Sequence, residues 1–195
     1  MNNDPIKSLK SSIRDNRDRG SVGEFLREKI SPGSKLLSVS AYFTIYAYEA
    51  LKNHLNKIER LDFLFGEPRF IKALDPNKID KKSFKIEDEE IKLSNRLEQN
   101  RIAKECAEWI KQKVNIKSIK HTNLLHGKLY HIDNNGVEEA IMGSSNFTVR
   151  GLGLAANNNI ELNLEVDSKR DRNDLKDWFY EIWNNDEIVE GHIQH

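Results

Sequence analysis

Hydrophobic and polar positions are patterned most clearly around a short polar turn in the second half of the chain. Apolar-rich runs cover Leu124 to Ile132 and Glu138 to Met142, and the turn-forming residues Asp133-Asn134-Asn135-Gly136 separate them. Two such runs joined through Asn-Gly predict a β-hairpin. Period-two counting places His126 and Lys128 on one face of the first strand, with about 7 Å between their Cα atoms.

Two buried strands with a helix between them are predicted closer to the N-terminus. Lys35 to Phe43 is apolar enough for a central strand, and Thr44 can cap a helix that reaches Ile58. Arg60 to Gly66 then forms the second strand, and a crossover of this length favours parallel pairing. Further helices are predicted over residues 22–30, 95–113 and 167–184, and further strands over 116–119 and 160–166.

Together these elements predict an α/β fold in a single domain, residues 1–195. We expect a mixed, largely parallel central sheet with helices on both faces. Residues 1–20 are expected to form an N-terminal helix or a phosphate-contacting arm, and residues 67–94 a charged loop. Residues 160–166 alternate strictly between apolar and polar positions, which is the cleanest strand pattern in the chain.

Composition and charge narrow the classes of protein to consider. The chain has 195 residues, of which 37% are hydrophobic and 32% charged, as is usual for a globular domain with a core. Since it has no membrane-spanning run and no signal-peptide pattern, we expect a cytoplasmic protein that does not associate with membranes. The formal net charge is zero, so nucleic-acid binding must rest on a local basic patch. The candidates for that patch are Lys111, Lys113, Lys117 and Lys120.

Neither a disulfide nor a metal site is predicted. The one cysteine, Cys106, lies on the apolar side of a predicted helix and is expected to be buried and inert. His126 and His131 are five residues apart on opposite strand faces and cannot hold one ion together. The acidic run 87–90 is interpreted as part of a solvated loop. We therefore expect no cofactor and no metal.

The predicted hairpin carries side chains that suit a phosphoryl group. The His126 imidazole can attack phosphorus, and the Lys128 ammonium can neutralise a non-bridging oxygen. Gly143 lets the backbone turn at the end of the second strand, where Ser144 and Asn146 can donate hydrogen bonds to the same oxygens. This arrangement predicts a phosphate-binding site.

The spacing His-x-Lys-x-x-x-x-Asp, followed by Gly-Ser-x-Asn, resembles the signature of the phospholipase D superfamily. The matching positions are His126, Lys128, Asp133, Gly143, Ser144 and Asn146. The resemblance implies an α-β-α sandwich and metal-independent hydrolysis. It also implies that one motif histidine becomes transiently phosphorylated while a second one protonates the leaving oxygen.

The resemblance suggests a role for each matching residue. His126 is the nucleophile or the acid, and Lys128, Ser144 and Asn146 hold the phosphate. Asp133 falls on the strand face opposite His126, so we expect it to act structurally in the hairpin and not in proton transfer.

Two further residues are less closely tied to the motif. Glu161 is the candidate carboxylate that orients the imidazole, because members of the family often carry an acidic residue on the strand after Gly-Ser-x-Asn. Tyr42 either lines the rim of the site or is an ordinary core or surface tyrosine.

Only one copy of the motif is present. The chain has six histidines, and none except His126 is followed by a lysine two residues later. Because the resemblance implies two histidines in each site, a member with a single motif is expected to pair them across the two-fold axis of a homodimer.

The expected substrate comes from a wider resemblance. Residues 41–44, residues 65–70 and the single motif together resemble phospholipase D-like domains at the N-terminus of some bacterial helicase or restriction-type proteins. This favours an endonuclease that acts on DNA in preference to RNA, with a helicase or translocase region in a longer parent chain. Two alternatives remain open: a non-catalytic nucleic-acid-binding or dimerisation module attached to a helicase, and a lipid phosphodiesterase. The lack of an apolar interfacial segment argues against the lipid enzyme.

Overall fold

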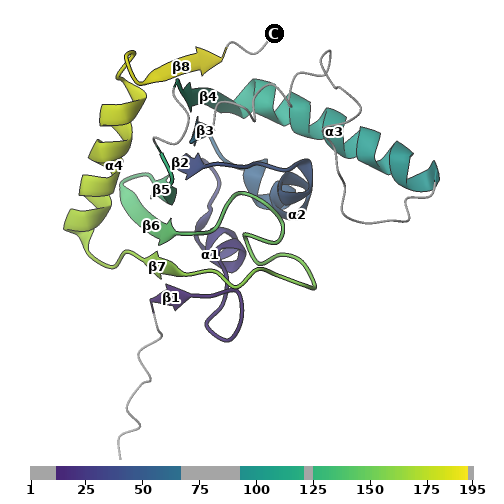
Figure 1. Ribbon diagram of the computed structural model, residues 1–195, viewed down its shortest axis with the longest axis horizontal. Coiled ribbons are helices and arrows are strands. Elements are labelled where there is room, and N and C mark those ends of the chain that lie inside the picture. The colour runs from purple at the N-terminus through teal and green to yellow at the C-terminus, as the bar shows by residue number, and fades with distance from the viewer. Residues whose placement is uncertain (1–11, 67–92, 121–124, 193–195) are drawn as a thin grey trace, which may run out of the picture.

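A computed structural model describes residues 12–66, 93–120 and 125–192 of the chain. Its strands are β1 (Ile13–Arg14), β2 (Lys35–Ser40), β3 (Arg60–Phe65), β4 (Val114–Ile119), β5 (Lys128–Asn134), β6 (Val137–Gly143), β7 (Asn163–Glu165) and β8 (Val189–His192). Its helices are α1 (Val22–Lys29), α2 (Ile45–Leu55), α3 (Leu93–Lys113) and α4 (Lys169–Trp183). Within these ranges all eight strands belong to one sheet, in the order β1-β7-β6-β5-β2-β3-β4-β8 (Figure 1).

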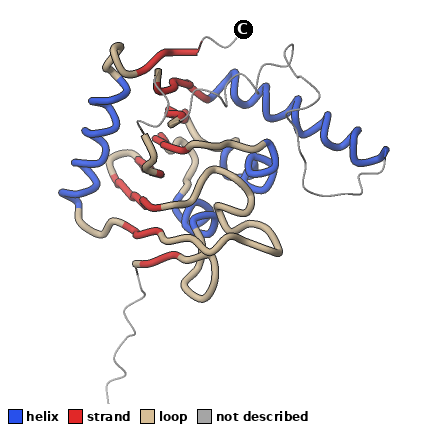
Figure 2. Tube along the Cα trace, viewed as in Figure 1, coloured by secondary structure: helices blue, strands red, loops and turns tan. Residues whose placement is uncertain are grey.

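The sheet is mixed, as predicted, but it is not largely parallel. Strand β2 pairs in parallel with β3, and β3 with β4. The other five pairings are antiparallel. Figure 2 marks the strands of this sheet in red. A parallel pair needs a long crossover, which α2 supplies between β2 and β3 and α3 between β3 and β4. An antiparallel pair can be joined by a tight turn, as β5 and β6 are. The predicted strand, helix and strand of residues 35–66 are confirmed as β2, α2 and β3, with Thr44 as the cap of α2.

Helices α1, α2 and α3 cover one face of the sheet (Figure 1). Helix α1 begins with a capping box between Ser21 and Glu24, which satisfies otherwise unpaired backbone N–H groups. Trp109 of α3 is buried in this layer and donates its indole N–H to the carbonyl oxygen of Leu55, 3.0 Å away. Cys106 is also buried here, and burial raises the pKa of its thiol to about 12, so the predicted inert cysteine is confirmed.

Helix α4 covers the opposite face, which confirms a sheet with helices on both sides (Figure 1). Its Phe179 is fully buried against Leu37, Leu64 and Leu129 of the sheet. Burying a phenylalanine side chain stabilises a fold by roughly 1.5–3 kcal/mol, so the aromatic stripe of α4 is part of the core.

The predicted hairpin is confirmed as β5 and β6. Asn135 and Gly136 at its turn have φ angles of 53° and 92°. Two successive positive φ values are typical of a type I′ turn, whose twist matches that of the flanking strands. The two faces of β5 also follow period-two counting, since Tyr130 and Ile132 pack under α1 to α3 whereas Leu129 packs under α4.

Both edges of the sheet differ from the prediction. The described part of residues 1–20 contains strand β1, which pairs with β7, and not a helix. Residues 1–11 lie outside the described residues. Strand β8 was not predicted, because Val189 to His192 is too short and too rich in polar residues to show a pattern. Residues 67–92 of the predicted charged loop also lie outside the described residues, and residues 93 and 94 already belong to α3.

Strand β7 carries an apolar surface that the sheet leaves uncovered. The alternating pattern of residues 160–166 predicted one strand, but only Asn163–Glu165 pair as β7. Ile160, Leu162 and Leu164 are 74%, 67% and 50% exposed, and Met142, which pairs with Leu164 across β6 and β7, is 44% exposed. These four residues are called the aliphatic stripe below. No helix among the described residues is both long enough and apolar enough to span a membrane.

Candidate active site

The motif residues gather at the end of the sheet where the parallel strands β2 and β3 finish. Strand β5 begins there, because it runs antiparallel to β2 and pairs Leu129 with Val39. Strand β6 finishes there at Gly143, the partner of Lys128. Ligands of α/β sheets usually bind just outside the carboxyl ends of the parallel strands, so the hairpin places its motif where the fold favours a ligand.

His126 lies in the segment just before β5, and its side chain is exposed to solvent. The predicted strand therefore starts only at Lys128, and period-two spacing does not describe the relation of the two side chains. Gly66, directly after β3, approaches this segment so closely that a Cβ atom on it would lie 2.4 Å from the carbonyl oxygen of Leu125. The missing side chain of Gly66 thus allows the end of β3 to pack under the segment that carries His126.

Lys128 is buried beneath the same segment. Its side chain is 5% exposed, and its Nζ donates a hydrogen bond to the main-chain oxygen of His126 at 2.9 Å. Burial lowers the pKa of Lys128, and the negative charge of Glu161 opposes that shift. An ammonium has three N–H donors, and among the described residues only the His126 oxygen accepts from this one. The remaining donors suit an anion bound beside His126.

Glu161 is held by two neighbours and lies on the Lys128 side of the site. The hydroxyl of Ser144 donates to its Oε2, and the Nδ2 of Asn159 donates to its Oε1 at 3.2 Å. The sequence predicted that Glu161 orients the imidazole of His126. In the part of the chain that the structure describes, the hydrogen bonds of this carboxylate go to Ser144 and Asn159 instead. The structure therefore joins Glu161 to Ser144, which was predicted to bind phosphate, and to Asn159, and shows no hydrogen bond to His126 among the described residues.

Asn146 is fixed by the end of β2. Its Oδ1 accepts hydrogen bonds from the backbone N–H of Ala41 at 3.1 Å and from the hydroxyl of Ser40 at 3.2 Å. The Ser40 hydroxyl also accepts from the backbone N–H of Phe147 at 2.9 Å. With its oxygen occupied in this way, Asn146 retains its NH₂ group as the donor for a phosphate oxygen.

Asp133 lies at the far end of the hairpin. Its Oδ1 accepts the backbone N–H of Gly136 at 2.6 Å, within the β5–β6 turn. Asp133 lies five positions after Lys128 in β5, which corresponds to roughly 16 Å between their Cα atoms. The structural role that the sequence predicted for Asp133 agrees with this position, and a direct part in the chemistry does not.

Taken together, the site offers an exposed imidazole, a desolvated ammonium, a hydroxyl and an amide at one edge of the sheet. An imidazole can act as a nucleophile, and a buried ammonium stabilises charge that develops on phosphoryl oxygens more strongly than it would in water. Among residues 12–66, 93–120 and 125–192, no group of three or more His, Cys, Asp or Glu side chains is arranged to hold a metal ion.

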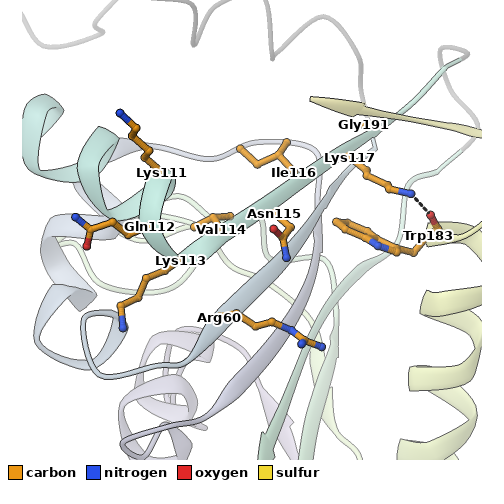
Figure 3. Close-up of a pocket in the computed structure, with 10 residues that line it drawn as sticks. All are labelled: Arg60, Lys111, Gln112, Lys113, Val114, Asn115, Ile116, Lys117, Trp183 and Gly191. Carbon is orange, nitrogen blue, oxygen red and sulfur yellow. Dashed lines mark hydrogen bonds between the residues drawn. The ribbon is translucent and has the colours of Figure 1, made fainter. Parts of the chain in front are cut away.

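The basic patch predicted beside the site is spread along β4, and two of its four lysines, Lys111 and Lys113, lie at the end of the sheet away from the site. Lys111, Lys113 and Lys117 line a hollow of about 620 Å³ around the start of β4 (Figure 3). Figure 3 shows that these side chains do not point toward a common centre, and Lys117 donates to the main-chain oxygen of Trp183 at 2.7 Å. Lys120 follows the other end of β4 and also donates to a main-chain oxygen. The four lysines do not form one patch because β4 separates them: Lys111 and Lys113 precede the strand, Lys117 lies within it and Lys120 follows it.

Three residues that support the site were not recognised from the sequence: Ser40, Gly66 and Asn163. Asn163 is 2% exposed and bonds to both the backbone N–H and the hydroxyl of Ser145, within the Gly-Ser-x-Asn turn. A polar residue among apolar ones was the only signal for Ser40 and Asn163. Their partners are distant in the sequence: Asn146 is 106 residues from Ser40, and Ser145 is 18 residues from Asn163.

A comparison with protein families identifies the group to which this site belongs. The sequence model of the family described as "Cardiolipin synthase, PLD-like domain" matches residues 72–183, which is more than half of the chain and includes the whole motif hairpin. The chain belongs to the phospholipase D-like family. Members of the phospholipase D superfamily act on phosphodiester bonds or transfer phosphoryl groups, which agrees with the side chains gathered at this edge of the sheet. A search of curated protein sequences finds no match.

Solved structures support the fold of this phospholipase D-like chain. Polyphosphate kinase from Porphyromonas gingivalis superposes with a TM-score of 0.51 over 89% of this chain, at 11% sequence identity. The match covers 22% of the length of that kinase. At this level of identity the similarity concerns the fold alone, and it confirms the predicted α/β architecture of the superfamily.

Proposed function

We propose that this chain is a metal-independent phosphodiesterase that cleaves nucleic acid, DNA in preference to RNA, through a phosphohistidine intermediate. One observation carries the proposal: the buried ammonium of Lys128 donates to the main-chain oxygen of His126, whose imidazole is exposed, and strand β6, which leads to Ser144 and Asn146, pairs with the strand of Lys128. This combination supplies a nucleophile together with fixed donors for the oxygens of one phosphate group.

In the first step, a ring nitrogen of His126 attacks the phosphorus atom and the bond from phosphorus to the leaving oxygen breaks. Lys128 and Asn146 donate hydrogen bonds to the non-bridging oxygens, which carry the developing charge, and Ser144 joins them by turning its hydroxyl from Glu161 to the phosphate. The leaving oxygen takes a proton from a second imidazole, which acts as general acid. The products of this step are a free hydroxyl end and a phosphohistidine on the protein.

In the second step, water attacks the phosphohistidine and gives its proton to the same second imidazole. The phosphorus–nitrogen bond breaks, which restores His126 and releases a phosphate monoester end. The second imidazole, now protonated again, is ready to act as acid in the next turnover.

The second imidazole is proposed to be His126 of another copy of this chain, in a two-fold homodimer with both histidines at one site. Two features support this arrangement. The chain carries a single motif, and Ile160 and Leu162 on either side of Glu161 are 74% and 67% exposed. If two copies bring their histidines to one phosphate, the residues around Glu161 must lie close to the two-fold axis of the dimer. The interface would then remove the side chains of Ile160 and Leu162 from water.

A lipid phosphodiester is the second candidate substrate. The family description names a cardiolipin synthase, and the aliphatic stripe would suit the surface of a bilayer as well as another protein. The sequence shows no apolar interfacial segment, but the aliphatic stripe provides exposed apolar area that the sequence pattern did not reveal. Nucleic acid remains our preferred substrate because of the resemblance to phospholipase D-like domains of helicase and restriction-type proteins, which also suggests that a translocase follows in a longer parent.

The deciding experiment measures hydrolysis in the presence of EDTA. The purified chain is incubated with labelled DNA, labelled RNA and vesicles that contain phosphatidylcholine or phosphatidylglycerol. We expect cleavage of nucleic acid that His126→Ala reduces by at least about 1,000-fold, since it removes the nucleophile. After rapid quenching, mass spectrometry should find phosphate attached to His126.

His54→Ala serves as the matched control, because His54 lies in the last turn of α2 and far from the motif in the fold. It should retain the wild-type rate. Strict dependence on magnesium, or undiminished hydrolysis by His126→Ala, would contradict the mechanism. Cleavage of lipid alone would establish the second candidate, and binding of nucleic acid without any hydrolysis would indicate a non-catalytic module.

A further inference from the structure

Two exposed tyrosines follow the end of β2, next to the residues proposed to hold phosphate. Tyr42 is 46% exposed and Tyr46 is 40% exposed. We infer that these two rings form a stacking surface for unpaired bases, and hence that the substrate is a single-stranded or locally unpaired nucleic acid. This inference rests on the proposed function and specifies the substrate of the same site.

The position of Tyr42 is tied to the motif by direct hydrogen bonds. The backbone N–H of Ala41 donates to the Oδ1 of Asn146 at 3.1 Å, and the hydroxyl of Ser40 donates to the carbonyl oxygen of Tyr42 at 2.8 Å. The same hydroxyl contacts Asn146 at 3.2 Å. A phosphate held by Asn146 would therefore lie close to the segment that carries Tyr42, so a base of the same strand can reach the ring.

The segment between the two tyrosines is anchored on both sides. Phe43 is 4% exposed and stacks on Phe147, with 5.1 Å between ring centroids and an interplanar angle of 27°. The backbone N–H of Thr44 donates to the carbonyl oxygen of Phe147 at 3.1 Å, and the Thr44 side chain caps α2 at Ala47. Because the backbone is already fixed, the two rings lose little conformational entropy when a base stacks on them.

The chemistry of the exposed side chains separates two kinds of partner. The aliphatic stripe on the β7 side offers apolar area without a π-face. Among the described residues, the large exposed hydrophobic side chains that carry a ring are Tyr42 and Tyr46. Aromatic rings stack on bases of any sequence, whereas aliphatic groups favour packing against protein. The two sides of the site therefore fit different occupants, a nucleic-acid strand at the tyrosines and a second copy at the stripe.

A continuous duplex does not present base faces to such a surface. Its bases are already stacked on each other, and exposing one requires unstacking at a cost of a few kcal/mol. An unpaired strand can place its bases on the tyrosines without that cost. We expect the site to prefer single strands, loops or frayed ends for this reason.

Binding is measured with the full chain carrying His126→Ala, which prevents turnover. The ligands are a fluorescein-labelled single-stranded DNA, the same strand with abasic positions, and the duplex of the same sequence. Tyr42→Ala should weaken binding of the single strand by about 5- to 100-fold, because stacking on one aromatic residue accounts for a factor of that size. Tyr46→Ala should have a similar or smaller effect, and Tyr42→Phe should stay within about twofold because the ring is kept.

The abasic strand retains the phosphates and removes the bases, so its affinity should not change in any of these variants. Val137→Ala is the matched control, since Val137 is 64% exposed at the other end of β6, and it should bind every ligand as the His126→Ala chain does. The inference is overturned if Tyr42→Ala binds the single strand normally, or if Tyr42→Phe or the abasic strand loses affinity to the same extent.

The two proposals can fail separately. Cleavage of DNA by the wild-type chain, together with unchanged affinity in Tyr42→Ala, would reject the stacking surface and leave the nuclease. Loss of single-strand binding in Tyr42→Ala, together with no cleavage of DNA or RNA by the wild-type chain, would reject the nuclease and leave the stacking surface. Tighter binding of the duplex than of the single strand would also overturn the inference.

Discussion

Lys128 and His131 are two of the buried ionisable residues of strand β5, and their surroundings differ. Lys128 lies on the face of the motif, where its Nζ donates a hydrogen bond to the main-chain oxygen of His126. Burial lowers the pKa of Lys128, whereas the negative charge of Glu161 acts to raise it. His131 lies on the α4 face and is 1% exposed, and neither of its ring nitrogens has a hydrogen-bond partner among the described residues. The first residue is therefore ready to bind an anion, whereas the second is a neutral ring held in the core.

The pKa of His131 leads to a prediction about stability at acidic pH. Burial lowers this pKa below its usual value of 6.5; the charge of Lys176 lowers it further, whereas the charges of Glu138 and Asp133 oppose the shift. Above pH 6.5 the ring is neutral in both states and has no effect. Below pH 6.5 the unfolded chain binds a proton that the folded chain does not, so folding stability falls as the pH decreases, by at most about 1.4 kcal/mol per pH unit.

Urea unfolding of the wild-type chain and of His131→Leu, between pH 7.5 and pH 5.5, checks this prediction. The free energy of unfolding of wild type should fall more steeply with decreasing pH than that of the variant, because leucine has no proton to bind. The difference between the two slopes isolates His131 from the other titrating groups. Equal slopes would show that His131 has the same pKa in the folded and unfolded chains.

Close packing between elements positions His126, the proposed nucleophile. The end of β3 supports the segment that carries His126, and Gly66 makes this contact without a side chain. On the other side, the end of β2 holds the Gly-Ser-x-Asn turn through Ser40. The geometry of the site thus depends on two parallel strands that contribute no catalytic group of their own.

The variant Gly66→Ala tests this arrangement. A Cβ atom there would lie 2.4 Å from the carbonyl oxygen of Leu125, so the backbone next to His126 has to move. Because a displacement of about 1 Å can lower a rate by 100-fold, we expect kcat to fall by roughly 10- to 100-fold. Gly191→Ala is the control, since a Cβ atom at Gly191 would meet nothing within 4 Å.

Steady-state kinetics on the cleaved substrate and thermal unfolding should be recorded for both variants. The expected pattern is a lower kcat for Gly66→Ala with a fold that still unfolds cooperatively, and wild-type values for Gly191→Ala. A Gly66→Ala chain with normal kcat would show that the segment before β5 can shift without consequence for the reaction.

For the whole molecule, the main feature is the aliphatic stripe beside the site. Its four residues lie on strands β6 and β7 and on the segment that leads into β7, next to Ser144 and Glu161. A formal net charge of zero gives little long-range repulsion between two copies. Association through the stripe would bury apolar surface and complete the proposed site at the same time.

The variant Leu164→Glu tests the proposed homodimer. Leu164 is 50% exposed and is not one of the proposed catalytic residues, so a carboxylate at this position remains solvated in a single copy. At a two-fold interface, each copy would bury one unpaired charge, and we expect the dimer to dissociate at least about 100-fold more readily. Sedimentation equilibrium and the dependence of activity on protein concentration measure this effect.

Val137→Glu provides the matched control, because Val137 is 64% exposed on β6 at the end remote from the site. It should dimerise as wild type does. The proposed homodimer would be wrong if the wild-type chain is a monomer at concentrations where it is fully active, or if Leu164→Glu has wild-type mass and activity.

Features encoded by consecutive residues could be predicted from the sequence. The β5–β6 hairpin follows from alternation and from Asn135-Gly136, and the β2-α2-β3 unit follows from apolar runs and the cap at Thr44. Period-two counting also placed Lys128 and Leu129 on opposite faces of β5. The motif residues were recognised by their spacing in and around a single hairpin, whose pairing brings Lys128 next to Gly143 and leaves Asp133 at the turn.

The sequence alone thus determined the hairpin, its motif and the mixed α/β class, because local patterns of side chains control local structure. Only the tertiary structure decided which elements meet at the site: the support of Gly66 under His126, the bond between Ser40 and Asn146, and the partners of Glu161. It also showed that the apolar side of β7 is uncovered and that the predicted rim lysines Lys111 and Lys113 precede β4, at the end of the sheet away from the site. These features depend on contacts between distant parts of the chain, and no pattern of neighbouring residues specifies such contacts.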